Sequence, residues 1–365
     1  MCGIVGYIGY RDAYPIIIKG LKRLEYRGYD SAGIMLFNDT NIVVKTKGKV
    51  SDLEQIAASH DNKGKTLGMG HTRWATHGIP SDLNSHPHLS NSGKIAIVHN
   101  GIIENYAALK KMLSDNGFHF KSDTDTEVLV NLIEFIKTSQ KLKVGKAVQI
   151  ALTQVVGAYA IAVIDADRPG EVVVAKLGSP LAIGIGKDEY FIASDASPFI
   201  EYTKRTIYLD DNEMAVISRE QGFKMYSIIN DKVITPIIQD IQLSLETIEK
   251  GGFDYFMLKE IHEQPHAITD TFRGRLLVDQ RRINISGIEH NKEIFKNASR
   301  ITIIACGTSW HAGLVAEYLF EDAARIPVEV EYASEFRYRN PVINKGDIVI
   351  ALKILSYFLY MPDLT

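Results

Sequence analysis

Cys2 is the residue best placed for chemistry in this sequence, because it follows Met1 directly and precedes the strand-like run Ile4 to Ile8. Removal of Met1 would leave a thiol and a free α-amine on the same residue. An α-amine has an ordinary pKa of about 7.7–8.0, so it can accept the thiol proton near neutral pH without a distant histidine. The alternative for Cys2 taken alone is a small buried residue near a chain end.

A second group of reactive side chains lies in the run GHTRWATHG, at Arg73, Trp74, Thr76 and His77. The arginine guanidinium is a planar fork that binds a carboxylate through two hydrogen bonds. Arg73 is therefore a candidate for holding a substrate carboxylate. A surface arginine whose guanidinium packs on Trp74 is the alternative.

Asp125 is the candidate partner of Arg73. It lies in the first turn of an expected helix, where Thr124 and Glu127 have the spacing of a capping box. The Asp125 carboxylate could hold a substrate ammonium group, and compensation of the helix dipole is the alternative. Together, Arg73 and Asp125 would bind the two charged groups of an amino acid.

Asn100 and Gly101 interrupt the apolar run from Ile95 to Ile103. An Asn-Gly pair between apolar runs is typical of a type I′ hairpin turn. The functional alternative uses the same two residues, because a side-chain amide beside an accessible glycine N–H supplies the two donors of an oxyanion hole.

Several motifs in a fixed order resemble one family. They are MCGIVGYIG, RGYDSAG at residues 27–33, GHTRWATHG, HNGIIENY and SDTDTEV. Over about residues 1–240 the chain is similar to the class II, N-terminal-nucleophile glutamine amidotransferases. Within that group it most resembles the glutamine:fructose-6-phosphate aminotransferase (isomerizing) family, also called the glucosamine-6-phosphate synthases.

The resemblance implies a role for each matching residue. Cys2 would be the nucleophile, with Asn100 and Gly101 as the oxyanion hole. The glutamine-binding residues would be Arg73, Asp125, Trp74 as a gate, Thr76, His77, His86 and Arg27.

Two histidine patterns suggest metal sites, and we predict neither a metal nor a cofactor. Five histidines fall between residues 71 and 99 without recognisable ligand spacing. His262 to His266 match H-E-x-x-H, but Pro265 is expected to interrupt the helix that this zinc motif requires.

The run ACGTSWHAG places a Gly-Thr-Ser turn between a strand and a helix. The hydroxyls and N–H groups of such a turn suit a sugar phosphate, and ordinary N-capping by Thr308 or Ser309 is the alternative. This run and EFRYRNP resemble the start of the first sugar-isomerase (SIS) module of the synthases, which implies that Thr308 and Ser309 contact a sugar phosphate. The resemblance stops after residues 346–351, so we expect a truncated module.

From these motifs we expect Cys2 to hydrolyse L-glutamine to glutamate and ammonia. In the full-length family the ammonia converts fructose-6-phosphate to glucosamine-6-phosphate, and the family is homodimeric. For this chain we expect weak or missing amino transfer and leave the oligomeric state open. The alternatives are a glutaminase-only enzyme, or an inactive fragment that acts as a sugar-phosphate-binding or regulatory protein. A related enzyme with another acceptor domain is disfavoured by CGTS and FRYR.

The hydrophobic periodicity predicts which elements position these residues. Helices are expected from Tyr14 to Leu24, after Thr124 and from Val144 to Val155. Short β-rich runs follow, at residues 159–164, 171–175, 181–185, 190–193 and 213–217. Beyond a polar helical segment, a strand, a helix and further strands at 301–305, 310–323, 328–332 and 348–351 indicate a βαβ unit.

We therefore predict an α+β chain. A glutaminase domain with the αββα N-terminal-nucleophile hydrolase sandwich occupies residues 1–240, and an interdomain linker occupies 241–285. The N-terminal part of an α/β sugar-isomerase domain, with a doubly wound parallel sheet, occupies 286–365.

Composition agrees with an enzyme of small substrates. The 365 residues are 45% apolar and 23% charged, with a formal charge of −3, which disfavours disorder, nucleic-acid binding and membrane-surface binding. Two cysteines, no evident secretory signal and no apolar run long enough to span a bilayer indicate a cytoplasmic protein.

Overall fold

The computed structural model describes residues 2–38, 41–75, 78–241, 252–272, 275–277, 282–283 and 291–352. The chain divides into two compact units, Met1–Gly251 and Gly252–Thr365. Within the described residues, no helix is long and apolar enough to cross a membrane.

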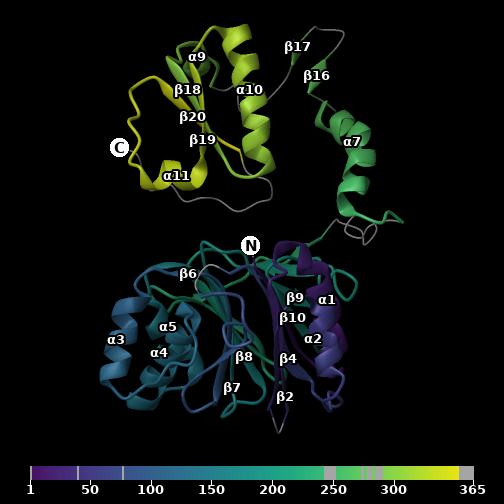
Figure 1. Ribbon diagram of the computed structural model, residues 1–365, viewed down its shortest axis with the longest axis vertical. Coiled ribbons are helices and arrows are strands. Elements are labelled where there is room, and N and C mark those ends of the chain that lie inside the picture. The colour runs from purple at the N-terminus through teal and green to yellow at the C-terminus, as the bar shows by residue number, and fades with distance from the viewer. Residues whose placement is uncertain are drawn as a thin grey trace. The chain divides into compact units, whose positions relative to one another are not determined.

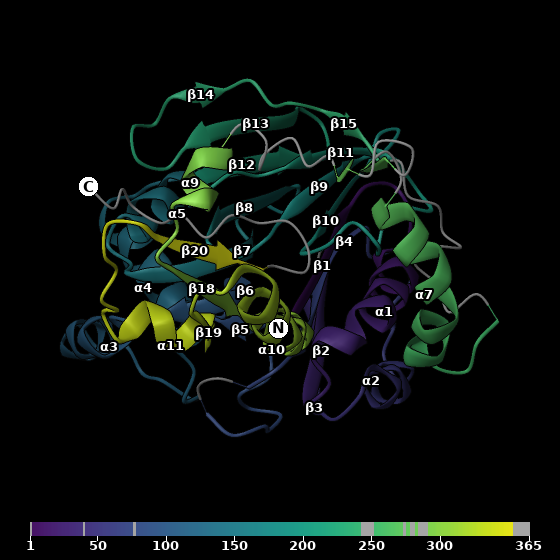
Figure 2. The same cartoon turned by 90° about the horizontal axis from the view of Figure 1, so that it is seen from above.

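Two sheets form the centre of the first unit (Figures 1 and 2). Among the described residues, the larger sheet has the strand order β15-β11-β9-β10-β1-β4-β2-β3. Its strands are β1 (Gly3–Ile8), β2 (Ser31–Phe37), β3 (Asn41–Lys47), β4 (Leu67–Arg73), β9 (Ala182–Ile185), β10 (Tyr190–Ala193), β11 (Arg205–Tyr208) and β15 (Gln239–Asp240).

The second sheet has the order β14-β13-β12-β8-β7-β6-β5 over the same described range. Its strands are β5 (His88–Leu89), β6 (Ile95–Ile103), β7 (Gly157–Asp165), β8 (Glu171–Leu177), β12 (Glu213–Ser218), β13 (Gly222–Ser227) and β14 (Val233–Ile234).

Helices cover the outer face of each sheet, which makes a four-layer αββα sandwich (Figure 1). The helices against the first sheet are α1 (Ala13–Leu24), which continues into the 3₁₀ turn η1 (Glu25–Arg27), and α2 (Val50–Ala57). Those against the second sheet are α3 (Tyr106–Asp115), α4 (Asp125–Ser139) and α5 (Val144–Leu152).

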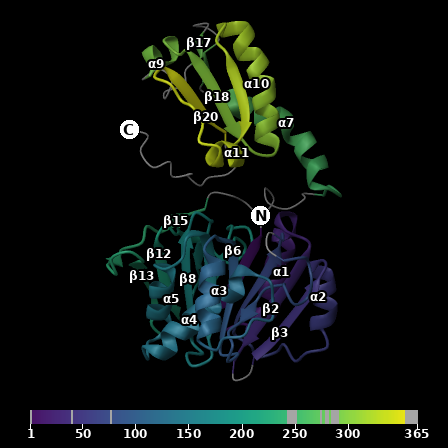
Figure 3. The ribbon, with the colours of Figure 1, turned by 60° about the vertical axis from the view of Figure 1, so that its left-hand side comes forward.

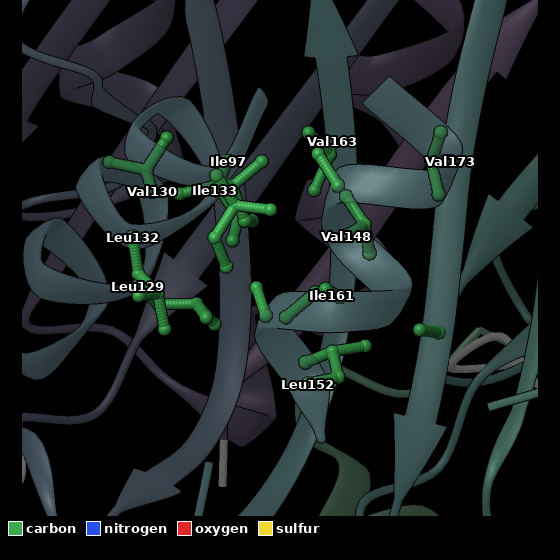
Figure 4. Packing of buried hydrophobic residues seen from close by; sticks show 14 of the residues in the cluster. Ile97, Leu129, Val130, Leu132, Ile133, Val148, Leu152, Ile161, Val163 and Val173 are labelled. Carbon is green, nitrogen blue, oxygen red and sulfur yellow. The ribbon is translucent and has the colours of Figure 1, made fainter. Parts of the chain in front are cut away.

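The alternation of side chains along β1 shows why a sandwich forms. Ile4 and Ile8 pack into the core between the two sheets, whereas Val5 and Tyr7 pack against the helices on the other face. Because both faces of the strand are covered, all of β1 is buried. The core under α4 and α5 is similarly dense, with Leu129, Ile133 and Val148 packed on β6, β7 and β8 (Figure 4).

The second unit contains a parallel sheet with the order β19-β18-β20 in its described part. The helices and strands of the second unit are α7 (Phe256–Phe272), β16 (Leu276–Leu277), β17 (Arg282–Ile283), α9 (Lys292–Lys296), β18 (Arg300–Ala305), α10 (Thr308–Ala324), β19 (Val328–Tyr332), α11 (Ala333–Tyr338) and β20 (Asp347–Ala351). Helix α10 lies along the sheet (Figure 3), so the βαβ unit expected from the sequence is confirmed.

Two local expectations are wrong. Helix α7 continues through Pro265. The residues around this proline are exposed, so water can solvate the carbonyl group that lacks a helical N–H partner. Asn100 and Gly101 do not form a hairpin turn, because β6 runs through both and pairs with β7 from Ile95 to Ile103.

Candidate active site

Cys2 lies at the start of the central strand of the first sheet. Gly3 pairs with Thr72 of β4, which brings the end of β4 beside Cys2. The Trp74 N–H donates to Cys2 Sγ at 3.2 Å, and Sγ lies 3.5 Å from the Trp74 carbonyl oxygen, which accepts from it. Burial raises the pKa of the Cys2 thiol, and the hydrogen bond from the Trp74 backbone offsets part of that effect. The thiol is therefore protonated at neutral pH and needs a base.

Asn100 reaches Cys2 from the second sheet. Its side-chain Nδ2 donates to the Cys2 carbonyl oxygen at 3.1 Å. The next residue, Gly101, has φ of +139°, and a Cβ added there would lie 1.9 Å from the Ala158 carbonyl oxygen on β7. Only glycine fits this position, because any side chain would push the two strands apart. The Asn-Gly pair thus presents its polar groups beside Cys2 within a continuous strand.

Arg73 and Asp125 come from different elements and meet at one cavity. Arg73 ends β4, is 3% exposed, and donates from Nη2 to the Gly78 carbonyl oxygen at 3.1 Å. Asp125 begins α4, is 4% exposed, and accepts the Ile103 N–H at Oδ2 over 2.7 Å. Its carboxylate therefore links α4 to the end of β6 and faces the protein interior, so it does more than compensate the helix dipole.

The expected capping box at α4 is only half formed. Thr124 Oγ1 accepts the Glu127 N–H at 3.3 Å, as expected for an N-cap. The Glu127 carboxylate, however, accepts from the N–H groups of Lys121 and Ser122, at 2.9 and 2.6 Å, and does not bind the Thr124 N–H. The glutamate thereby fixes the loop before the helix, which holds Asp125 in place.

A cavity of about 20 Å³ lies where these elements meet. It is lined by Cys2, Arg73, Trp74, His86, His99, Gly101, Thr124, Asp125 and Thr126. This volume holds about one water molecule, so an amino acid enters only if a wall moves. Trp74 is the exposed part of the wall, at 49%, and packs edge-on against Tyr29. A larger cavity of about 650 Å³ lies beside α4, but none of the candidate site residues named from the sequence lines it.

Of the remaining candidate residues, the structure places His86 at the cavity and Arg27 away from it. His86 lines the cavity. Arg27 is not among the cavity-lining residues, and its Nη1 lies 3.5 Å from Asp195 Oδ2 and 3.4 Å from the Ser194 carbonyl oxygen. Since Ser194 Oγ accepts the Ile4 N–H, Arg27 supports the start of β1 from the side. Thr76 and His77 lie outside the described residues.

Sequence reasoning assigned no role to Asp30, although it lies in the RGYDSAG motif. The Asp30 Oδ2 accepts the Ala75 N–H, and the Asp30 N–H donates to the Arg73 carbonyl oxygen at 3.2 Å. Asp30 thereby bonds the backbone of Arg73 and Ala75, the residues before and after Trp74. The position of the motif, with an acidic residue just before a buried strand, is the only signal for this role in the sequence.

His71, His86, His88 and His99 form a buried cluster, of which His86 and His99 line the cavity. Burial is the main cause that lowers the pKa of His71 to about 3, and it places the pKa of His86 and His88 well below the usual value. The imidazoles of His71, His86 and His88 are therefore neutral near pH 7. Over the described ranges, no group of histidine, cysteine or acidic residues is arranged to hold a metal ion.

A cysteine at the start of the central strand of an αββα sandwich defines the N-terminal-nucleophile fold class, so the predicted fold class is confirmed. Residues 51–234 match the glutamine amidotransferase domain family, and residues 294–356 match the SIS domain family. The chain belongs to the glutamine amidotransferase domain family.

Two curated relatives with high sequence identity to the chain are both glutamine–fructose-6-phosphate aminotransferases (isomerizing). The chain is 56% identical over 354 residues to the protein of Bacteroides thetaiotaomicron, covering 96% of this chain and 57% of that protein. It is 53% identical over 358 residues to that of Chlorobaculum tepidum, covering 96% of this chain and 58% of that protein. The chain thus spans somewhat more than half the length of these relatives, and the resemblance stated from the motifs is confirmed.

A solved structure supports the fold. Glutamine phosphoribosylpyrophosphate amidotransferase from B. subtilis, complexed with ADP and GMP, superimposes with a TM-score of 0.55 at 25% identity. The match covers 90% of this chain and 65% of that chain.

Proposed function

We propose that the first unit hydrolyses L-glutamine to glutamate and ammonia, with Cys2 as the nucleophile. One observation carries the proposal: Cys2, Gly101, Arg73 and Asp125 line one small cavity. Beside it, the Asn100 amide donates to the Cys2 carbonyl oxygen. A nucleophile, two candidate oxyanion donors, a cation and an anion are what an enzyme needs to bind and cleave an amino-acid side-chain amide.

The reaction begins once Met1 has been removed and Cys2 carries a free α-amine. This amine accepts the thiol proton while Sγ forms a bond to the carboxamide carbon of glutamine. The negative charge that develops on the carboxamide oxygen is stabilised by the Asn100 amide and the Gly101 N–H. When the tetrahedral intermediate collapses, the C–N bond breaks, the α-ammonium returns its proton, and ammonia leaves.

A γ-glutamyl thioester then remains on Cys2. Water attacks its carbonyl carbon while the α-amine accepts a water proton. The C–S bond breaks, the sulfur regains a proton from the α-ammonium, and glutamate is released. Each proton taken by the amine is returned in the same half-reaction, so the cycle balances without a cofactor.

Specificity for glutamine follows from the two buried charges. The Arg73 guanidinium would bind the α-carboxylate, and the Asp125 carboxylate would bind the α-ammonium group. Trp74 would act as the gate, and His86, Thr76, His77 and Arg27 would complete or support the pocket. The small volume of the cavity supports a gate, because a substrate larger than water requires Trp74 or its neighbours to move.

We further propose that the ammonia serves fructose-6-phosphate, giving glucosamine-6-phosphate in the whole protein. The names of the two curated relatives and the SIS match support this acceptor. We assign glutamine hydrolysis to residues 1–240, a linker to 241–285 and sugar-phosphate contacts to Thr308 and Ser309 at the start of α10. No side chain caps this helix, whose N-cap is Gly307 with φ of +60°. We place the reaction in the cytoplasm.

Glutamate release by the wild type, Cys2→Ala and Cys306→Ala tests the proposal. We expect release from the wild type and Cys306→Ala and background release from Cys2→Ala, because the two cysteines lie in different units. Intact mass measurement shows whether Met1 is absent, as the mechanism requires. Equal background release from all three Met1-free proteins would refute glutaminase activity. Adding fructose-6-phosphate and measuring glucosamine-6-phosphate separates a full synthase from a glutaminase-only enzyme.

A further inference from the structure

His71 contacts the proposed oxyanion-hole residue from the side away from Cys2. It lies within β4, and none of its surface is exposed. Its Nε2 lies 2.9 Å from Asn100 Oδ1 and 3.1 Å from the His99 carbonyl oxygen. His71 is not among the residues that line the cavity, and it contacts Asn100, His99 and His86. Of these three, Asn100 is the one whose side chain donates to Cys2.

The hydrogen-bond partners determine which nitrogen of His71 carries the proton. The His99 carbonyl oxygen can only accept, so Nε2 must be the protonated nitrogen. The same N–H then also donates to Asn100 Oδ1. The Nδ1 of His71 has no hydrogen-bond partner among the described residues, which agrees with this tautomer.

These contacts also determine the orientation of the Asn100 amide. In the orientation present, Oδ1 faces the His71 N–H and Nδ2 donates to the Cys2 carbonyl oxygen at 3.1 Å. Reversing the amide would place an NH₂ group against the His71 N–H and an oxygen against the Cys2 oxygen. Both contacts would then be repulsive, and buried polar groups would lose their hydrogen-bond partners.

Stacking fixes the His71 ring itself. Its ring lies 4.1 Å from that of His86, with an angle of 12° between the planes. His86 Nδ1 in turn accepts the His99 N–H at 3.2 Å. Because burial lowers the pKa of His71 to about 3, the ring remains neutral and keeps one N–H across the pH range of ordinary assays.

We propose that His71 is a positioning residue: its Nε2–H holds the Asn100 amide with the NH₂ group toward Cys2, where the oxyanion of glutamine hydrolysis forms. This inference rests on the proposed glutaminase function. Without the His71 N–H, both amide orientations become accessible, and one of them presents an oxygen to the oxyanion. The loss therefore falls on the transition state and leaves the binding of ground-state glutamine largely unchanged.

The variants His71→Phe and His71→Gln test this role. Phenylalanine preserves a ring against His86 but has no N–H, whereas the glutamine side-chain amide can donate again. We expect His71→Phe to lower kcat for glutamate release about 10- to 100-fold with KM changed less than about twofold, since removing an oxyanion donor outright costs about 10²–10³. His71→Gln should recover a substantial part of kcat.

Alkylation of Cys2 by iodoacetamide separates positioning from damage to the fold. This displacement uses the Cys2 sulfur but forms no oxyanion, so its rate in His71→Phe should match the wild type, with peptide mass mapping to distinguish Cys2 from Cys306. In an Asn100→Ala background, His71→Phe should cause no further loss of kcat, because the amide that it orients is gone.

Three outcomes would overturn the inference: an unchanged kcat in His71→Phe, a parallel fall in the alkylation rate, or an equal further loss in the Asn100→Ala background. Failure of the glutaminase proposal is a different result, because the wild type itself would then release no glutamate.

Discussion

Gly101→Ala is the substitution whose effect follows most directly from the geometry of the site. The added Cβ would lie 1.9 Å from the Ala158 carbonyl oxygen and 2.7 Å from its carbonyl carbon. Since carbon and oxygen normally approach to about 3.3 Å even in close backbone contacts, β6 and β7 must separate by about 1.4 Å. The φ of +139° adds backbone strain of about 1–3 kcal/mol.

Both effects lead to measurable losses. A displacement of about 1 Å at a catalytic group costs about 100-fold in rate, so we expect kcat for glutamate release to fall at least that much. We expect the free energy of unfolding of the first unit to fall by about 3–5 kcal/mol. Urea unfolding can be followed by Trp74 fluorescence in a Trp310→Phe background, because the chain has two tryptophans, one in each unit.

Gly93→Ala is the matched control. Gly93 also has a positive φ, +77°, but a Cβ there would meet no atom within 4 Å. Gly93→Ala should therefore lower the free energy of unfolding only by the backbone strain, about 1–2 kcal/mol, and leave kcat unchanged. If Gly101→Ala and Gly93→Ala had the same stability and activity, the steric argument for glycine at position 101 would be wrong.

Two further predictions concern the substrate and the base. Arg73→Lys should raise KM for glutamine at least about tenfold with a smaller change in kcat, because a lysine cannot bind a carboxylate through two hydrogen bonds. An unchanged KM in steady-state assays would show that Arg73 does not bind the substrate carboxylate. Activity should rise with pH through about 7.7–8.0 as the α-amine loses its proton, because burial raises the pKa of the Cys2 thiol and keeps it protonated below that range. The pKa values of the buried His71, His86 and His88 are lowered, so these residues should add no step to the pH profile of activity near pH 6.5. A kcat/KM profile that is flat from pH 6 to 9 would contradict the α-amine as the base.

Local sequence patterns predicted many of the elements. The spacing of Ile17, Leu21 and Leu24 predicts α1, and the structure confirms it. The β-rich runs later in the first unit correspond to β7, β8, β9, β10 and β12. The strands β2 and β4 escaped prediction because they are buried on both faces and contain several small residues, so they lack the alternation that marks a strand with one solvated face.

Two local motifs gave wrong predictions because their side chains or backbone groups have other hydrogen-bond partners. Asn100-Gly101 has the local signature of a turn, but pairing with β7 keeps both residues in a strand. The expected capping box at Thr124 fails because the Glu127 carboxylate finds two other N–H donors in the preceding loop. At Asn100-Gly101 the distant strand pairing outweighs the local preference for a turn, whereas at Thr124 one local hydrogen-bond pattern replaces another.

The sequence by itself determined the residue types of the site: a cysteine next to Met1, an arginine and an aspartate of opposite charge, and an Asn-Gly pair. It also carried the ordered motifs by which the family resemblance was stated. Only the tertiary structure decided that Cys2, Arg73, Gly101 and Asp125 line one cavity and that Asn100 bonds to Cys2 beside it. It also decided that Arg27 supports β1 from outside that cavity, that Asp30 bonds the residues on either side of Trp74, and that His71 contacts Asn100. The physical reason is that contacts between residues many positions apart depend on strand pairing and burial, which no local spacing records.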